Sequence, residues 1–346
     1  MLRTVAAGLA AFAIVCAPDA LRAQPANGPA GGPAMPAGAA KAMERRNALM
    51  AQCGPVPARL PEADAAKLPI HVTAWGSTGP AVLIVHGGVQ GGLGGGPSTF
   101  AKQEPLAQQG WRLQVVDRPG FGQSQSRGVD DMQADAVWIA DMLGDGANLI
   151  GHSWGGAEAL LAAARRPEAV RSLVLVEPAL QTLLIGDPAI EMDPTLKADA
   201  MRWAGLLMSA QAPRDYALGF AHSLGAVEGA NASNTAVAAL DADPQLAARY
   251  GCALLQARMA PPPAMLQAAA TVARARIPVL VISGGWSPFF DAVGEKTAAL
   301  TGGRHVVVRS ANHFVQLTGA EEFNKLVDAF MRDADKARPA QRGTVR

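Results

Sequence analysis

The sequence lacks an excess of either charge and, beyond its first residues, any long apolar run. Its 30 basic and 29 acidic residues give a formal net charge of +1, so we expect no nucleic-acid partner and no attraction to an anionic membrane surface. No segment after the N-terminus is long and apolar enough to cross a bilayer, which predicts no stable membrane insertion. Because 49% of the 346 residues are hydrophobic, the chain can bury the core of one large α/β domain with an insertion.

Nucleotide-binding loops are missing as well. The densest glycine run, Gln90–Gly96, has neither the Lys-Ser/Thr ending of a P-loop nor the G-x-G-x-x-G spacing of a dinucleotide site. We interpret it as a mobile loop at the rim of a pocket, and we predict neither a cofactor nor a metal ion.

The N-terminus has the pattern of a secretory signal. Arg3 supplies a positive start, Val5–Ala17 is an apolar stretch too short to span a bilayer, and the small residues Ala20 and Ala23 follow near the expected cleavage site. We therefore predict that residues 1–23 are a signal peptide and that the protein is secreted or periplasmic. Lipidation of Cys16 is the alternative, although the residue before it fits that signal poorly.

Cysteine is scarce, with three in the whole chain. If Cys16 leaves with the signal, Cys53 and Cys252 remain, and an oxidising compartment permits one disulfide between them. Two separate buried thiols are the alternative. Neither cysteine lies in a sequence context typical of catalysis.

Apolar runs of the strand type alternate with helical stretches over residues 61–178 and again over 276–346. Runs such as Val82–Val85 are continuously hydrophobic, which indicates strands buried on both faces. The predicted fold class is α/β, with a mostly parallel central sheet covered by helices. Residues 179–275 contain no convincing strand and predict a helical cap inserted between the sixth and seventh core strands, whereas 24–60 predict a flexible linker and N-terminal segment.

The most informative motif is Gly151-His152-Ser153-Trp154-Gly155, which lies between a short apolar run and a helix of small residues. Strand, Gly-x-Ser-x-Gly and helix together predict a nucleophile elbow, with the hydroxyl of Ser153 exposed at the tip of a sharp turn. The alternative is a glycine-rich turn with an incidental serine.

A nucleophilic serine needs a base and donors for the developing oxyanion. His313 follows a late apolar strand, so we expect it at the carboxyl edge of the sheet near Ser153. The backbone N–H of Trp154 and that of Gly88, in the turn after the strand Ala81–His86, are the predicted oxyanion hole.

These motifs resemble the α/β-hydrolase superfamily, over roughly residues 67–178 and 276–335. The supporting residues are His86-Gly87-Gly88, Asp117-Arg118-Pro119-Gly120-Phe121-Gly122-Gln123-Ser124, the Ser153 elbow and Asn312-His313. The chain is similar to secreted bacterial serine esterases and lactonases with a Ser-Glu-His triad, and a serine in the elbow disfavours the alkyl-enzyme chemistry of dehalogenases.

The acid of the triad departs from the commonest pattern of this superfamily, because Ser287 stands where an aspartate is expected. Glu177 occupies a second acid position that some members use, at the end of an apolar strand. A buried carboxylate there is costly without a partner such as the imidazole of His313. We therefore predict Glu177 as the acid, with Asp291 as the alternative.

The resemblance and the residues together predict a serine hydrolase that cleaves a small-molecule carboxylic ester or lactone through an acyl-enzyme on Ser153. An aminopeptidase or amidase on the same scaffold is the alternative within enzymes, because acidic residues in the insertion could hold a substrate amine. A non-catalytic ligand-binding homologue is the alternative outside them.

Overall fold

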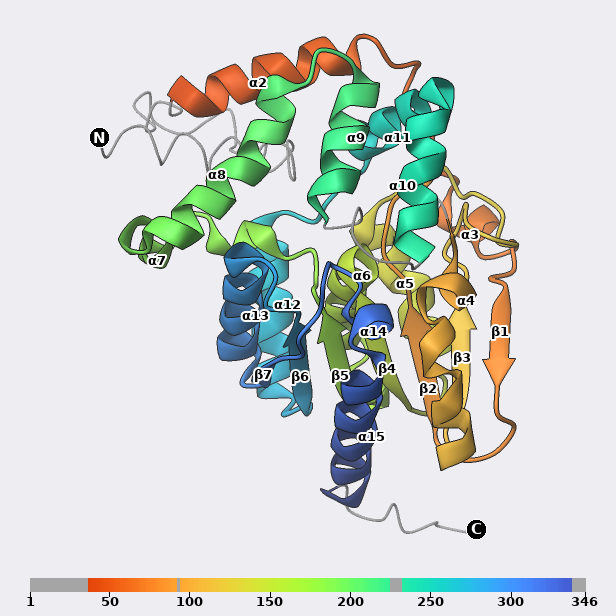
Figure 1. The fold of residues 1–346 in the computed structure, drawn as a ribbon. Coiled ribbons are helices and arrows are strands. Elements are labelled where there is room, and N and C mark those ends of the chain that lie inside the picture. Colours follow the sequence, from red (N-terminus) through yellow and green to blue (C-terminus); the bar gives the residue numbers. More distant parts are fainter. Residues whose placement is uncertain (1–36, 92–93, 225–231, 338–346) are drawn as a thin grey trace, which may run out of the picture.

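The computed structural model describes residues 37–91, 94–224 and 232–337, and a seven-stranded sheet forms its centre (Figure 1). The strands are β1 (Val72–Trp75), β2 (Ala81–Val85), β3 (Arg112–Val116), β4 (Ala147–His152), β5 (Val170–Val176), β6 (Val279–Ser283) and β7 (Arg304–Val307). Their order is β1-β3-β2-β4-β5-β6-β7, and all neighbours are parallel except β1 and β3. The mostly parallel α/β sheet predicted from the apolar runs is confirmed. The predicted signal peptide, residues 1–23, lies outside the described residues.

Side chains of successive strand residues point to opposite faces, and each face packs under its own helices. Leu83 and Val85 belong to one hydrophobic cluster, whereas Val82 and Ile84 belong to the other. The helices that contribute to the first cluster include α5 (Met132–Met142), α6 (Ser153–Arg165), α12 (Pro262–Arg274) and α13 (Pro288–Thr301). On the second face lie the 3₁₀ helix η2 (Ala101–Gln109), α14 (Val315–Thr318) and α15 (Ala320–Ala337). The strands are therefore buried on both faces, as their continuous hydrophobicity predicts.

A helical cap connects β5 to β6 and lies over one end of the sheet (Figure 1). Its elements are η4 (Gln181–Leu184), α7 (Pro188–Met192), α8 (Pro194–Ser209), α9 (Pro213–Ser223), α10 (Ala232–Ala242) and α11 (Pro244–Gln256). The sequence predicts this insertion between the sixth and seventh core strands, whereas the strands that flank it are the fifth and sixth of the seven in the described sheet. Helix α12, within the range expected to form the cap, packs instead against α6 and α13 beside the sheet. Short elements complete the core: α3 (Glu62–Ala65), α4 (Gly96–Thr99) and η3 (Pro167–Ala169).

Three cap helices begin at Asp-Pro pairs. The carboxylates of Asp187, Asp193 and Asp243 accept hydrogen bonds from backbone N–H groups in the first turns of α7, α8 and α11, and proline follows each aspartate. An aspartate satisfies N–H groups that have no partner within the helix, and proline tolerates the first helical position. Within the described residues, no helix combines the length and the apolar character needed to span a bilayer.

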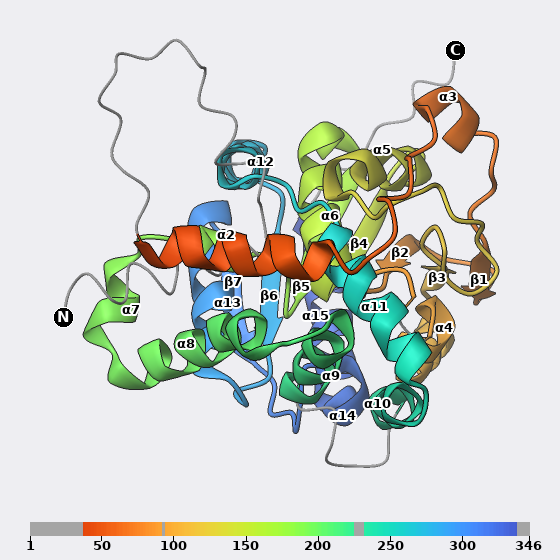
Figure 2. The same cartoon turned by 90° about the horizontal axis from the view of Figure 1, so that it is seen from above.

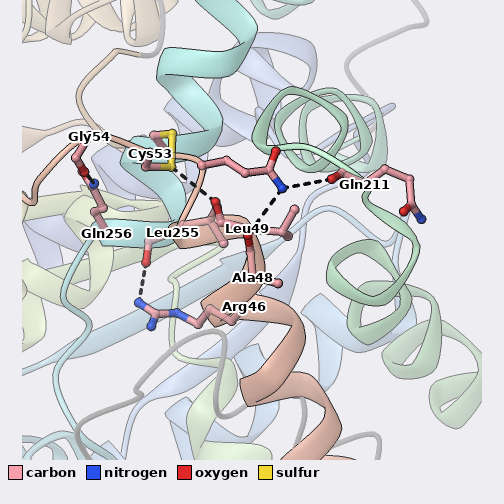
Figure 3. The surroundings of a disulfide bond; sticks show 10 residues. Arg46, Ala48, Leu49, Cys53, Gly54, Gln211, Leu255 and Gln256 are labelled. Carbon is pink, nitrogen blue, oxygen red and sulfur yellow. Dashed lines mark hydrogen bonds between the residues drawn. A yellow bond between two sulfur atoms is a disulfide. The ribbon is translucent and has the colours of Figure 1, made fainter.

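An N-terminal helix that the sequence did not predict, α2 (Ala37–Met50), lies across the outer side of the cap (Figure 2). Ala42 and Leu49 are fully buried there with residues of α8, α9 and α11. Just after α2, Cys53 forms a disulfide with Cys252 of α11, across a sequence separation of 199 residues (Figure 3). Of the two possibilities open from the sequence, the structure therefore has the disulfide, and it attaches the N-terminal helix to the cap.

Replacing both cysteines, Cys53→Ser with Cys252→Ser, is expected to lower the free energy of unfolding by about 2–5 kcal/mol, because the bond closes a long loop in the unfolded chain. Urea titration of the variant and of the wild type measures this loss. A reductant should lower the stability of the wild type to that of the variant and leave the variant unchanged. Equal stability of oxidised wild type and variant would contradict the expectation.

Candidate active site

Ser153 lies at the turn between β4 and α6 with φ of +55°, a left-handed conformation that is uncommon outside glycine. The turn is closely packed, because the start of α6 lies against the end of β2 as well as the end of β4. A Cβ atom at Gly155 would lie 2.3 Å from the carbonyl oxygen of His86, at the end of β2. The carbonyl of Ser153 accepts a hydrogen bond from the N–H of Ala179 at 2.8 Å. This is the strand, strained serine and helix of the predicted elbow.

His313 lies in the loop after β7, and its side chain contacts Glu177. The distance between His313 Nδ1 and Glu177 Oε2 is 2.9 Å, and both side chains are buried. A carboxylate oxygen accepts, so Nδ1 carries the proton and Nε2 has a free lone pair. Nε2 has no hydrogen-bond partner in the described part of the chain, and His313 lines the same pocket as Ser153. The ring nitrogen that a general base uses therefore has no competing hydrogen bond from the described residues.

Glu177 directly follows β5 and, like Ser153, has a positive φ, of +46°. Besides His313 it accepts a hydrogen bond from the N–H of Gly284 at 2.7 Å and from Nε1 of Trp286 at 3.2 Å. Three donors therefore converge on one buried carboxylate, and their hydrogen bonds stabilise its charge against the effect of burial. No local signal in the sequence marks Trp286 as a donor to Glu177.

Asp291, the alternative acid, is hydrogen-bonded to residues other than His313. It is in the first turn of α13, where its Oδ1 accepts hydrogen bonds from the hydroxyl of Ser283 at 2.5 Å and from the N–H of Gly285 at 3.2 Å. Ser287, at the position expected for an aspartate, caps α13 and donates to Asp199 of the cap. The structure brings Glu177, and not Asp291, to the imidazole of His313.

Burial shapes the titration of this pair. It lowers the pKa of His313 from 6.5 to about 3, because the charged imidazolium loses its hydration. Burial also raises the pKa of Glu177 well above its ordinary value, and the hydrogen bonds from Gly284 and Trp286 oppose that rise. The neutral imidazole is consequently the favoured form at neutral pH.

The pH dependence of any reaction in which His313 is the general base should reflect this lowered pKa. A general base must be neutral, so kcat/KM should keep its plateau value as the pH falls through 6.5 and decline only in more acidic solution. Steady-state rates across the acid range measure the midpoint, and assays after return to neutral pH separate titration from unfolding. A reversible midpoint above 6.5 would contradict this expectation.

The two residues predicted to supply the oxyanion donors line the same pocket as Ser153. Gly88 has φ of +84°, and Gly88 and Trp154 both line the pocket with Ser153. The N–H of Trp154 belongs to the first turn of α6, where backbone donors have no partner within the helix. A Cβ atom on the preceding Gly87 would lie 2.6 Å from Cβ of Ser153, so this turn needs glycine to approach the serine so closely.

His86 orients the turn that carries Gly88. The backbone N–H of Arg118 donates to His86 Nε2 at 3.0 Å, so the ring proton is on Nδ1, which donates to the carbonyl of Gly87 at 2.8 Å. The carbonyl of Gly87 and the N–H of Gly88 belong to one planar peptide group and point in opposite directions. Holding the carbonyl therefore fixes the direction of the Gly88 N–H. Burial lowers the pKa of His86 to about 3, which keeps the ring neutral.

A pocket of about 180 Å³ opens at these residues, between the core and the cap. Most of its wall is apolar and includes Val89, Phe121, Trp203, Leu206, Phe220, Leu224, Val237, Leu240, Leu254, Met259, Phe290 and Phe314. Apart from the histidines, the polar side chains are hydroxyls and an amide, and no Asp, Glu, Lys or Arg of the described residues lines it. The cap carboxylates Asp193 and Asp215 cap helices, and Asp199 binds α13.

The chain belongs to the α/β-hydrolase fold family, whose pattern matches residues 80–320, more than half of the sequence. Part of the chain is 35% identical over 127 residues to the 2-hydroxy-6-oxo-6-phenylhexa-2,4-dienoate hydrolase of Comamonas testosteroni, covering 35% of this chain and 44% of that enzyme. Another match is 34% identical over 94 residues to the pimeloyl-[acyl-carrier protein] methyl ester esterase of Neisseria meningitidis serogroup A, covering 27% and 28%. The matches thus span less than half of these relatives.

Solved structures share the fold at low sequence identity. The 2-hydroxy-6-oxo-6-phenylhexa-2,4-dienoate hydrolase of a Rhodococcus species superposes with a TM-score of 0.55 at 18% identity, covering 80% of this chain and 98% of that one. A bacterial membrane phospholipase A gives a TM-score of 0.54 at 22% identity, covering 80% and 89%. Both likenesses support the arrangement of sheet and helices.

Proposed function

We propose that this protein is a serine hydrolase that cleaves uncharged carboxylic esters, including lactones, through an acyl-enzyme on Ser153. The observation that carries the proposal is the buried hydrogen bond between Glu177 and Nδ1 of His313, a histidine that lines the same pocket as the strained Ser153. The three groups follow three different strands: Ser153 follows β4, Glu177 follows β5, and His313 lies in the loop after β7. A nucleophile, a base and an orienting acid in these roles recur on unrelated folds.

In the proposed reaction, Nε2 of His313 takes the proton of the Ser153 hydroxyl as Oγ attacks the ester carbonyl. The N–H groups of Gly88 and Trp154 donate to the oxyanion that forms. Collapse of this intermediate breaks the bond to the alkoxy group, which leaves with the proton from His313. Water, deprotonated by the same imidazole, then attacks the acyl-enzyme and releases the acid and free Ser153. Glu177 holds the imidazole in the required tautomer and stabilises its charged form.

The pocket wall supports an uncharged substrate. A carboxylate or ammonium group buried there would meet no opposite charge from the described residues, and an unpaired buried charge is costly. The Comamonas relative is named for a dienoate, which is a carboxylate, and an aminopeptidase would need to hold a substrate amine. The uncharged pocket wall argues against both kinds of charged substrate. A cavity of about 150 Å³ accommodates benzene, which indicates that a group slightly larger than benzene fits here.

Three methyl esters of similar size test this selectivity. Methyl pentanoate should have a kcat/KM at least about 100-fold above those of monomethyl succinate and of methyl 4-aminobutanoate, because only the neutral ester avoids an unpaired buried charge. Titration of the released acid measures all three, and p-nitrophenyl butyrate is the positive control. Preferred hydrolysis of the anionic ester would favour a dienoate-type substrate, and preference for the amine would favour a peptidase.

We also propose that the protein is secreted or periplasmic. The disulfide between Cys53 and Cys252 supports this, because such bonds persist in oxidising compartments. Fractionation of the native host with detection of the processed N-terminus tests it, and recovery of the full-length chain from the cytosol alone would refute it.

A further inference from the structure

The two oxyanion donors come from separate elements, the turn after β2 and the start of α6, and a buried ion pair connects them. Arg118 follows β3 and Glu158 lies in the second turn of α6, and both side chains are fully buried. Neither residue lines the pocket. Sequence reasoning assigned no chemistry to the Asp117–Ser124 turn that contains Arg118.

On one side, Arg118 holds the turn that carries Gly88. Its guanidinium donates through Nη1 to the carbonyl of Gly88 at 2.7 Å, and its backbone N–H donates to His86 at 3.0 Å. His86 in turn donates to the carbonyl of Gly87. The peptide groups on both sides of the Gly88 Cα are therefore fixed by contacts that begin at one residue.

On the other side, Glu158 holds the start of α6. Its Oε1 accepts hydrogen bonds from the indole N–H of Trp154 at 2.7 Å and from Nη2 of Arg118 at 2.9 Å. A second contact, between Arg118 Nε and Glu158 Oε2, measures 2.8 Å. Arg118 and Glu158 thus share one hydrogen bond and a second close contact between opposite charges. A continuous series of contacts runs from the Gly88 carbonyl through Arg118 and Glu158 to the indole of Trp154.

Two further carboxylates complete the surroundings of the guanidinium. Asp130 lies 3.1 Å from Arg118 Nη2 and accepts a hydrogen bond from the N–H of Gln90, while Asp135 lies 3.9 Å away and pairs with Arg59. A buried ion pair of this kind often adds no stability over well-packed apolar residues. The pair connects the two elements that carry the backbone donors, and the rate of oxyanion formation depends on the distance and orientation of such donors.

We propose that Arg118 and Glu158 are positioning residues, which together hold the backbone N–H groups of Gly88 and Trp154 at the distance and orientation that the oxyanion hole requires. The inference rests on the proposed serine hydrolase function. It predicts that disturbing the pair weakens transition-state binding and leaves ground-state binding in the apolar pocket nearly unchanged.

The test uses Arg118→Lys and Glu158→Gln, which keep size and leave the pocket wall intact, with Arg127→Lys as the control. Arg127 is another buried arginine, whose guanidinium donates to the carbonyl of Leu68. Rates with p-nitrophenyl butyrate are normalised to active sites titrated with a fluorophosphonate. Inhibition constants are measured for a trifluoromethyl ketone, which forms a tetrahedral oxyanion adduct with a serine, and for hexan-1-ol, which forms none.

In each pair variant, kcat per active site should fall about 10-fold or more, less than for complete loss of a donor, and KM should stay within about two-fold. Affinity for the trifluoromethyl ketone should fall by the same factor as kcat/KM, whereas affinity for hexan-1-ol and all values for Arg127→Lys should stay near wild type.

Should Arg118→Lys not fold, Glu158→Gln carries the test alone. Unchanged kcat and ketone affinity per active site, with only a lower melting temperature, would show a merely structural pair. A wild type that neither cleaves esters nor binds the ketone would refute the proposed function itself, and this inference with it.

Discussion

Ser153→Ala is expected to lower kcat/KM for p-nitrophenyl butyrate by at least about 10⁴-fold, because the covalent route disappears with the hydroxyl while the apolar pocket and the oxyanion donors remain. Alanine can adopt the backbone of this position no less readily than serine, so the variant should fold. Circular dichroism and hexan-1-ol binding establish that the fold and the pocket are intact.

Ser209→Ala is the matched control, because the hydroxyl of Ser209 donates to the carbonyl of Leu206 on the cap and does not line the pocket. It should have wild-type activity. Residual turnover in Ser153→Ala close to that of wild type would mean that another group is the nucleophile.

Glu177→Gln is expected to lower kcat by about 10³–10⁴-fold with a smaller change in KM, as for the acid of other triads. The physical reason is the number of donors around this side chain. His313, Gly284 and Trp286 all donate to the carboxylate, and a glutamine amide offers one oxygen and an NH₂ group that must face one of them. If it faces His313, the imidazole is forced into the tautomer whose Nε2 carries the proton and cannot act as a base.

Asp291→Asn is the discriminating control for this prediction. Asp291 accepts from Ser283 and Gly285, in the first turn of α13, and makes no contact with His313. Asparagine there should retain kcat within a few fold, with some loss of stability. Full activity in Glu177→Gln together with loss in Asp291→Asn would reverse the assignment of the acid.

The parts of the site that follow from short sequence segments were the most predictable. Glycine on both sides of Ser153, between an apolar run and a helix of small residues, specifies a turn through local sterics alone. Glu177 was a candidate because it occupies an acid position that some members of the resembled superfamily use, and because a carboxylate at the end of an apolar strand needs a buried partner. The sheet followed from continuous hydrophobicity, which reports burial on both faces.

Contacts between distant segments could not be predicted in the same way. The donation from Trp286 to Glu177 depends on how the turn after β6 lies against the end of β5, and the Arg118–Glu158 pair joins residues 40 positions apart in the chain. The docking of α2 depends on its burial against the cap and on a disulfide that the sequence permitted but did not require. The Asp-Pro pairs that begin α7, α8 and α11 are local signals that could have located these helices, but not the direction in which they point.

The most direct test of the central claim is mass spectrometry of the folded protein after reaction with a fluorophosphonate, followed by peptide mapping. The account predicts one adduct, on Ser153, with a labelling rate that falls sharply in Glu177→Gln and hardly changes in Asp291→Asn. A folded protein that takes no adduct, or that takes it on a residue other than Ser153, would contradict the account.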